Sequence, residues 1–264
     1  GNLGFALGPL LTTSLLLAFG LRGAALILLP LLAMSAVLTL FFPRFNSYHR
    51  RSFQRETRGV SAAENVWGAF SLLTVALICR SIIFYGINTF LPLYWIVVLN
   101  QSKTMGALAL TILLVTGALG TLIGGRLADR YGRRVVLLVG FGALGPLLLA
   151  FVTLGTLNMP LALALLLPIG LALFAPASVM IVMGQEYLPG YVGTASGVTL
   201  GLSVSIGGIT TPLFGHVADL YGVHASLVGL IFVPLLALIV TLALPRERAK
   251  GVRLEARKEV SSSV

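Results

Sequence analysis

Charge is scarce in this sequence, and so are the residues that form disulfides and metal sites. Only 10% of its 264 residues are charged, against about 25% in ordinary soluble proteins. Cys79 is the single cysteine, which excludes an intramolecular disulfide and a cysteine-based zinc site. With a mean hydropathy of +1.00, the chain is too apolar for an ordinary soluble domain, so much of its surface must meet lipid.

Motifs of soluble enzymes are also absent. The sequence contains no Walker A loop, no H-E-x-x-H motif and no G-x-S-x-G motif. Its eight carboxylates are scattered, mostly over polar segments. His216 and His224 flank Asp219, but one short turn does not bring a convergent set of ligands together. We therefore expect no cofactor, no metal and no enzymatic activity.

Long apolar runs dominate the chain. A membrane-crossing helix needs about 20 mostly apolar residues, and eight runs meet this length: 1–19, 23–42, 68–98, 104–125, 135–157, 160–183, 193–218 and 224–244. Two polar stretches, 43–66 and 245–264, are expected to be a linker and a tail. The chain opens without Met inside an apolar run, so we expect a longer protein cut in mid-helix.

The basic residues lie on one side of the expected membrane. If 43–66 is inside the cell and successive helices alternate, 126–134 and 245–264 are inside too. These three segments hold 15 of the 18 Lys and Arg residues, whereas Arg22 and Lys103 lie outside and Arg80 lies within a span. This positive-inside bias predicts that the net charge of +10 faces lipid headgroups rather than nucleic acid. The expected location is the inner (cytoplasmic) membrane, with the C-terminus in the cytoplasm.

Residues 125–134 read Gly-Arg-Leu-Ala-Asp-Arg-Tyr-Gly-Arg-Arg and lie between two apolar spans. They match G-x-L-A-D-R-x-G-R-R and resemble the signature loop of the major facilitator superfamily, a class of membrane transporters. An ordinary basic turn is the alternative. The resemblance implies a conformational latch between transport states. The residue types suit a charged turn, with glycines for turning and close helix approach, a carboxylate acceptor, and arginines at headgroup level: Gly125, Gly132, Asp129, Arg130, Arg133 and Arg134.

A weaker copy of this pattern follows 90 residues later. Residues 215–222 read Gly-His-Val-Ala-Asp-Leu-Tyr-Gly. Three helices separate the two copies, so they fall on opposite sides of the membrane. Transporters of this kind are built from inverted three-helix repeats, although chance similarity between small-residue turns is the alternative.

The first span contains a further small-residue pattern. Gly4, Gly8 and Pro9 resemble the start of the G-x-x-x-G-P motif in the fifth helix of antiporters of the family. Glycines four apart form a flat face for helix contact, and proline bends the helix. Leu11–Thr13 stand where the family often has more glycines, so generic helix packing remains an alternative.

The resemblance covers the whole chain and implies an all-α polytopic fold. With the first span as family helix five, about eight transmembrane helices are present, namely family helices five to twelve. Residues 1–42 are then the last two helices of the N-terminal half. Residues 43–66 are the cytoplasmic linker between the halves, 67–244 the C-terminal six-helix half, and 245–264 a cytoplasmic tail.

The span 68–98 contains an arginine within an apolar run. A charge at the centre of a membrane costs at least about 2.5 kcal/mol on insertion scales, so Arg80 should face a cavity or a partner. Four interpretations remain open for this arginine. It binds an anionic substrate, it balances the charge of a proton-carrying carboxylate, it extends to the cytoplasmic interface, or it forms a pair with a structural role. Gly86 and Pro92 are expected to loosen this helix. Helical spacing places polar and aromatic residues beside Arg80 as candidates for the substrate or proton pathway: Phe84, Tyr85, Asn88 and Thr89.

Glu186 ends the span 160–183, just before Pro189. Two interpretations remain open for this carboxylate. It pairs with an arginine of 125–134 as a cytoplasmic gate residue, or it is solvated at the interface. Pro168 and Pro176 favour a flexible span in front of it.

Short stretches resemble one branch of the family. Residues 1–9, 80–94 and 184–189 are similar to the fosmidomycin-resistance branch, which implies proton-coupled efflux of a phosphonate antibiotic and hence antibiotic resistance. The expected function is secondary transport, by a monomer, of a small anionic or drug-like compound, with a proton as coupling ion. Import of a small organic acid or other metabolite is an alternative. A membrane-embedded enzyme and a receptor or scaffold without transport are further alternatives.

Overall fold

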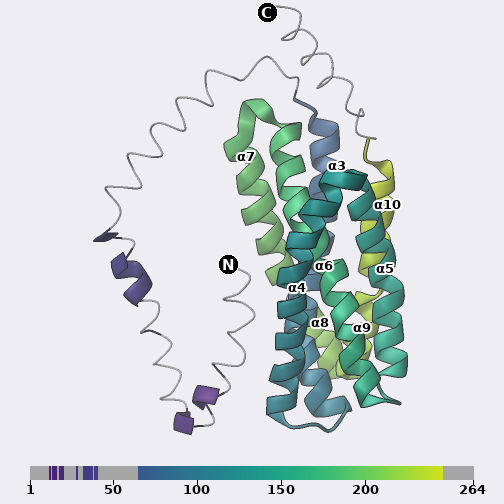
Figure 1. The fold of residues 1–264 in the computed structure, drawn as a ribbon. Coiled ribbons are helices and arrows are strands. Elements are labelled where there is room, and N and C mark those ends of the chain that lie inside the picture. Colours follow the sequence, from purple (N-terminus) through teal and green to yellow (C-terminus); the bar gives the residue numbers. More distant parts are fainter. Residues whose placement is uncertain are drawn as a thin grey trace, which may run out of the picture.

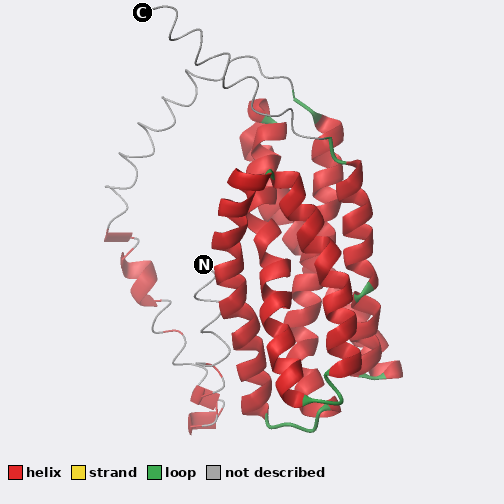
Figure 2. Cartoon of the chain, turned by 45° about the vertical axis from the view of Figure 1, so that its right-hand side comes forward, coloured by secondary structure: helices red, strands yellow, loops and turns green. Residues whose placement is uncertain are grey.

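The computed structural model describes residues 65–245 without a gap, together with residues 12, 14–16, 18–20, 28, 32–37 and 39–40. The regular elements in this described part are helices, with no strand among them (Figure 2). This confirms the all-α prediction. The expected spans 1–19 and 23–42, the linker and the tail lie wholly or mostly outside the described residues, as do Gly4, Gly8 and Pro9.

Residues 65–245 form six helical spans, each long and apolar enough to cross a membrane (Figure 1). Successive spans run in opposite directions (Figure 1). Two of them contain π-helical segments, named η2 and η4. The first span is α3 (Trp67–Leu93) with η2 (Tyr94–Val98), and the next three are α4 (Lys103–Tyr131), α5 (Arg133–Leu154) and α6 (Met159–Tyr187). The fifth span consists of η3 (Pro189–Tyr191), α7 (Val192–Ser196), η4 (Gly197–Leu202) and α8 (Ser203–Tyr221). The sixth span is α9 (Val223–Leu230) with α10 (Phe232–Ala243).

These six spans agree with the apolar runs from 68 to 244, but three spans are longer than predicted, among them Pro189–Tyr221, which contains the run 193–218. The runs 104–125 and 160–183 belong to helices that continue to Tyr131 and Tyr187. Hydropathy marks where the lipid ends, whereas Arg, Leu, Ala, Gln and Glu still favour helix beyond that point. The helices therefore extend past the apolar runs that identified them.

The bundle has two ends that differ in sequence. At one end, called the motif end, lie Gly132 between α4 and α5, Tyr187 at the end of α6 and Leu242 near the end of α10. Here the Val66 N–H donates a 2.9 Å hydrogen bond to the Tyr187 carbonyl. The opposite end, called the far end, contains the α3–α4, α5–α6 and α8–α9 connections (Figure 1).

The two copies of the sequence pattern form the same turn at opposite ends of the bundle. Gly132 has φ 95° and ψ 147°, and its N–H donates 3.0 Å to the Ala128 carbonyl. Gly222 has φ 88° and ψ 160°, and its N–H donates 2.9 Å to the Ala218 carbonyl. Side chains rarely adopt this conformation, so both positions require glycine. The agreement in geometry supports the predicted inverted repeat over chance similarity.

Helices α4 and α6 are packed unusually closely through small residues. A Cβ at Gly120 would lie 3.0 Å from the Leu171 Cα, and one at Gly124 would clash with the Ala175 carbonyl. Helices in lipid associate by van der Waals contact rather than by the hydrophobic effect, so close backbone approach is what stabilises such a pair.

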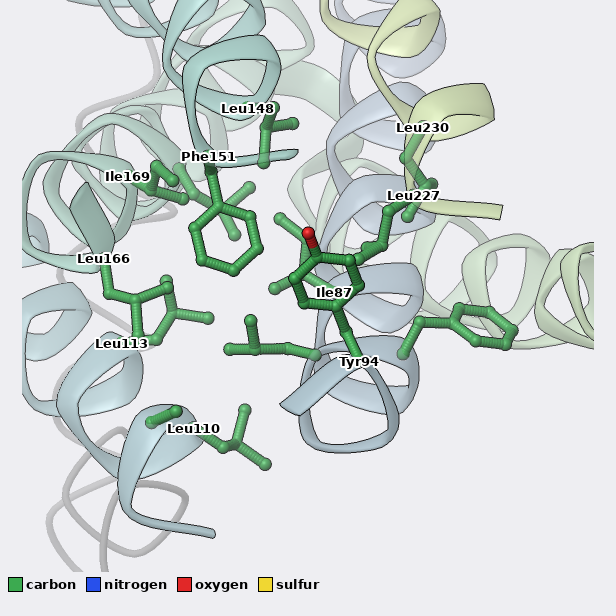
Figure 3. Close-up of a cluster of buried hydrophobic side chains, with 14 of the residues drawn as sticks. Ile87, Tyr94, Leu110, Leu113, Leu148, Phe151, Leu166, Ile169, Leu227 and Leu230 are labelled. Carbon is green, nitrogen blue, oxygen red and sulfur yellow. The ribbon is translucent and has the colours of Figure 1, made fainter. Parts of the chain in front are cut away.

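The largest core cluster of the described residues lies toward the far end. Side chains from α3, α4, α5, α6 and α9 converge there, and Figure 3 shows Tyr94 and Phe151 beside leucines and isoleucines of these helices. The Tyr94 Oη donates a 3.3 Å hydrogen bond to the Val152 carbonyl, and its ring packs 5.5 Å from that of Phe151. A second apolar cluster, which includes Leu137, Phe141 and Met180, fills the half of the bundle toward the motif end.

Candidate functional site

Arg80 lies between α3 and α6, deep in the bundle. With a helical rise of 1.5 Å per residue, its Cα lies about 20 Å along the helix axis from Trp67, the first residue of α3. Its Nε donates a 3.2 Å hydrogen bond to the Leu173 carbonyl, which lies about 21 Å from the motif-end terminus of α6. The guanidinium therefore stays at the depth of its own Cα, which argues against snorkelling.

Two aromatic rings flank the guanidinium. The Arg80 Cζ lies 6.0 Å from the ring centroid of Phe84 and 5.8 Å from that of Phe174. The two rings meet edge to face, with centroids 5.6 Å apart. Cation–π contacts of this kind contribute about 0.5–2 kcal/mol each. Within residues 65–245, the structure gives Arg80 no carboxylate within salt-bridge distance.

The acceptor of the Arg80 hydrogen bond lies beside a proline in α6. Pro176 has no N–H, so the carbonyl of Ala172, four residues earlier, lacks its usual helical donor. Arg80 donates to the next carbonyl along the chain. A polar region at mid-membrane depth is tolerated where protein buries it or a cavity exposes it, and this one is shared by α3 and α6.

The other candidates on α3 differ in how they lie. The Asn88 Nδ2 donates 2.7 Å to the Phe84 carbonyl, and the Tyr85 ring packs 5.3 Å from the Phe84 ring. Thr89 is exposed. Of the predicted pathway residues, the structure brings Arg80, Phe84 and Tyr85 into one group with Phe174.

Gly86 and Pro92, which the sequence predicts to loosen this helix, lie in different surroundings. A Cβ at Gly86 would lie 2.6 Å from a methyl group of Leu230, so Gly86 marks a close contact between α3 and α9. The helix runs unbroken through both positions to Leu93 and then widens into η2. The irregular backbone therefore lies after Pro92, in η2, and not between Gly86 and Pro92.

The signature segment 125–134 is mostly helix rather than loop. Helix α4 continues to Tyr131 and α5 begins at Arg133, so Gly132 alone forms the connection. The expectation of close helix approach at Gly125 is also wrong, because a Cβ there would meet open space. Its neighbour Gly124 packs against α6, since helical rotation of about 100° per residue turns only one of the two toward that helix.

Two arginines of the segment connect α5 to other helices at the motif end. Arg133 forms an ion pair with Glu186 at the end of α6, and the Glu186 side chain is 53% exposed. The expected contact with an arginine of 125–134 is therefore present, whereas a role as a gate residue stays a prediction. The Arg134 Nη2 donates a 2.5 Å hydrogen bond to the Leu242 carbonyl of α10. The Arg134 Nε is buried and has no hydrogen-bond partner among the described residues. The motif end is therefore held by charge across three helices.

The remaining charges of the segment point outward. Asp129 and Arg130 are exposed, and the Arg130 guanidinium lies 5.4 Å from the ring centroid of the adjacent Tyr131. In the described part of the chain, no hydrogen bond to Asp129 is present, so its expected acceptor role is not seen there.

Phe174 and the Leu173 carbonyl were missed by sequence reasoning. A backbone carbonyl has no sequence signature, and a phenylalanine in an apolar run resembles any membrane residue. The available signal was Pro176, which marks a nearby irregularity in hydrogen bonding. The far-end histidine His224 stacks on Tyr94, with ring centroids 6.1 Å apart. In the described part of the chain, no three His, Cys, Asp or Glu side chains come together to hold a metal ion.

Known proteins resemble the chain over most of its length. An uncharacterized MFS-type transporter of Bacillus subtilis, YfnC, is 30% identical over 247 residues, covering 90% of this chain and 59% of the relative. The fosmidomycin resistance protein of Escherichia coli K12 is 27% identical over 255 residues, covering 95% of this chain and 61% of the relative. The chain thus spans about three fifths of the length of these curated relatives.

The family assignment agrees with the fold and the two glycine turns. The Major Facilitator Superfamily matches residues 1–212, a range that includes the first four described spans and most of the fifth, Pro189–Tyr221. This chain belongs to the Major Facilitator Superfamily, and its described part has six helices long and apolar enough to cross a membrane.

Proposed function

We propose that the protein exports a small anionic or drug-like compound across the cytoplasmic membrane by alternating access, driven by protons. The observation that supports this most is the position of Arg80, held between α3 and α6 with no carboxylate partner in residues 65–245. A charge at this depth costs at least about 2.5 kcal/mol on insertion scales and is usually functional.

The chemistry of the site favours an anionic ligand. Of the three guanidinium nitrogens of Arg80, the Nε is the one that has a hydrogen-bond partner among the described residues. Both terminal nitrogens therefore remain for a ligand. Guanidinium binds phosphonate and carboxylate oxygens through paired, charge-assisted hydrogen bonds. The flanking rings of Phe84 and Phe174 would pack against an apolar part of the ligand. The likeness to the fosmidomycin resistance protein makes a phosphonate the first compound to test.

We assign the motif end to the cytoplasm. Within 65–245, four arginines lie within six residues of Gly132, whereas Lys103 lies at the far end, and basic residues favour the cytoplasmic side. Residues 67–244 are then the C-terminal half, 43–66 the linker and 245–264 a cytoplasmic tail. Residues 1–42 supply the last two helices of the other half. The protein acts as a monomer in contact with membrane lipids.

A drug-tolerance assay tests this function. We expect the complete gene that encodes this chain to raise the fosmidomycin tolerance of a transporter-deficient bacterium, and a protonophore to remove the gain. Other toxic anions, titrated in parallel, define the substrate range. Unchanged tolerance to every compound, despite confirmed membrane insertion, would contradict efflux and leave uptake of an organic acid as the alternative.

The ion pair at the motif end is proposed to act as a gate contact. We expect Glu186→Gln and Arg133→Gln each to lower the transport rate about two- to fivefold, because an exposed or partly exposed ion pair contributes up to about 1 kcal/mol. The charge-swapped protein, with Arg133→Glu and Glu186→Arg together, should recover part of the rate. Rates measured in membrane vesicles at equal protein amounts check this. If the swap is as slow as the worse single variant, the pair has another role.

A further inference from the structure

A groove of about 500 Å³ runs along the outside of the bundle between α4, α5 and α6. Its walls come from Leu127 and Tyr131 of α4 and from Val139 and Ala143 of α5, and Ala172 of α6 lies in its floor. The lining is almost wholly apolar. Val139 is 64% exposed although it lies within a membrane span.

The groove follows from how the three helices pack. Helices α4 and α6 approach closely at Gly120 and Gly124, and α5 packs on α6 at Gly140. Helices α4 and α5 are joined at Gly132 and contact each other less than either contacts α6. A furrow therefore remains between α4 and α5, with α6 as its floor, and it is open toward the exterior of the bundle.

The length of the groove fits one leaflet of a bilayer. On α5 its lining extends from Val135, next to the motif end, to Leu147, a distance of about 18 Å at 1.5 Å per residue. The hydrocarbon core of a membrane is about 30 Å thick, so one leaflet accounts for roughly half of it. The groove thus begins near one membrane surface and ends near the middle.

The motif-end mouth of the groove is basic. Tyr131 lines the groove there and is 57% exposed, and the Arg130 guanidinium lies 5.4 Å from its ring centroid. Arg126, one helical turn before Arg130, is also exposed. Clustered basic side chains beside an apolar surface at this level attract anionic lipid headgroups.

We propose that this groove binds an acyl chain of an anionic phospholipid, whose phosphate is bound by Arg130 at the mouth. The argument combines charge complementarity at one end with an apolar length that matches a single leaflet. The site lies between α4, α5 and α6, and its lining includes Ala172 and Ala175, next in sequence to Leu173 and Phe174 of the Arg80 group. The proposal does not depend on the substrate proposed above.

Native mass spectrometry of the full chain, purified in mild detergent, tests the proposal. With phosphatidylglycerol and phosphatidylcholine of the same acyl chains as probes, we expect about tenfold tighter binding of phosphatidylglycerol, equivalent to about 1.4 kcal/mol. Arg130→Gln should remove most of this preference. Ala143→Trp should fill the groove and weaken both lipids about tenfold. The matched control Ala164→Trp, at an exposed alanine of α6 outside the groove lining, should bind both as the wild type does.

Val139→Trp provides a second variant if Ala143→Trp fails to fold, because the Val139 side chain is already largely exposed. Unchanged lipid binding in the folded groove variants would overturn the proposal, as would equal affinity of the wild type for the two lipids. A dimer that is lost in Ala143→Trp, with no lipid retained, would instead identify a second copy as the occupant and would also overturn it.

Discussion

Replacing Arg80 by alanine is expected to lower transport at least about 100-fold, or about 2.7 kcal/mol, while the protein still inserts in the membrane. The loss follows because charge-assisted hydrogen bonds to an anionic ligand contribute about 1.5–3 kcal/mol each. Insertion should not suffer, since removing a mid-membrane charge relieves a cost of at least about 2.5 kcal/mol. Efflux rates normalised to the amount of protein in the membrane provide the measurement.

Arg80→Lys separates ligand binding from a merely structural role. Lysine keeps the positive charge but loses the planar fork and the Nε contact with Leu173. We expect a loss of about tenfold, mainly as a higher KM for the anion. Normal transport by Arg80→Ala would refute the assignment. Equal loss in both variants, together with a lower melting temperature, would make Arg80 a structural residue that joins α3 to α6.

Gly124→Ala is expected to have the largest effect on stability among the glycine variants of α4. Its Cβ would clash with the Ala175 carbonyl, a rigid backbone atom, so α4 and α6 would have to separate. Overpacking of this kind costs about 1–3 kcal/mol. The adjacent Gly125→Ala meets open space and should leave the melting temperature unchanged. Thermal denaturation in detergent compares the two variants, with the fraction of protein that stays monodisperse measured at each temperature.

This pair of neighbours also distinguishes two explanations for the signature segment. If Gly125→Ala is the more destabilising, the α4–α6 contact is not where the structure places it. If only Gly124→Ala is destabilising, the requirement for glycine comes from helix packing in front of the segment rather than from turning within it.

The sequence predicted the described spans because membrane helices have a simple physical signal. Apolar length alone located all six spans from Trp67 to Ala243, and the spacing of Gly132 and Gly222 identified the repeated turn. The pairing of Glu186 with an arginine of 125–134 was one of two open interpretations, and chemistry could not rank them without knowing the rotation of α6. The choice of Arg133 as partner depended on that rotation.

The details that the sequence did not predict depend on helix rotation and on backbone atoms. Gly125 and Gly124 are neighbours with opposite environments, and a shift of one residue exchanges them. Gly86 is a packing position because Leu230 happens to lie opposite it. The Arg80 acceptor is the carbonyl of Leu173, which any residue type would supply. Such features are set by how two helices meet rather than by the composition of either.

The most direct test of the proposed function is proton release from everted membrane vesicles that contain the protein encoded by the complete gene. With a preformed proton gradient reported by a quenched fluorescent dye, adding fosmidomycin should partly restore fluorescence, because each substrate taken up into the vesicle releases protons from it. Vesicles with Arg80→Ala, at equal protein amounts, should show no such response. An unchanged signal with fosmidomycin and other anions, or an equal response from Arg80→Ala, would contradict proton-coupled export through Arg80.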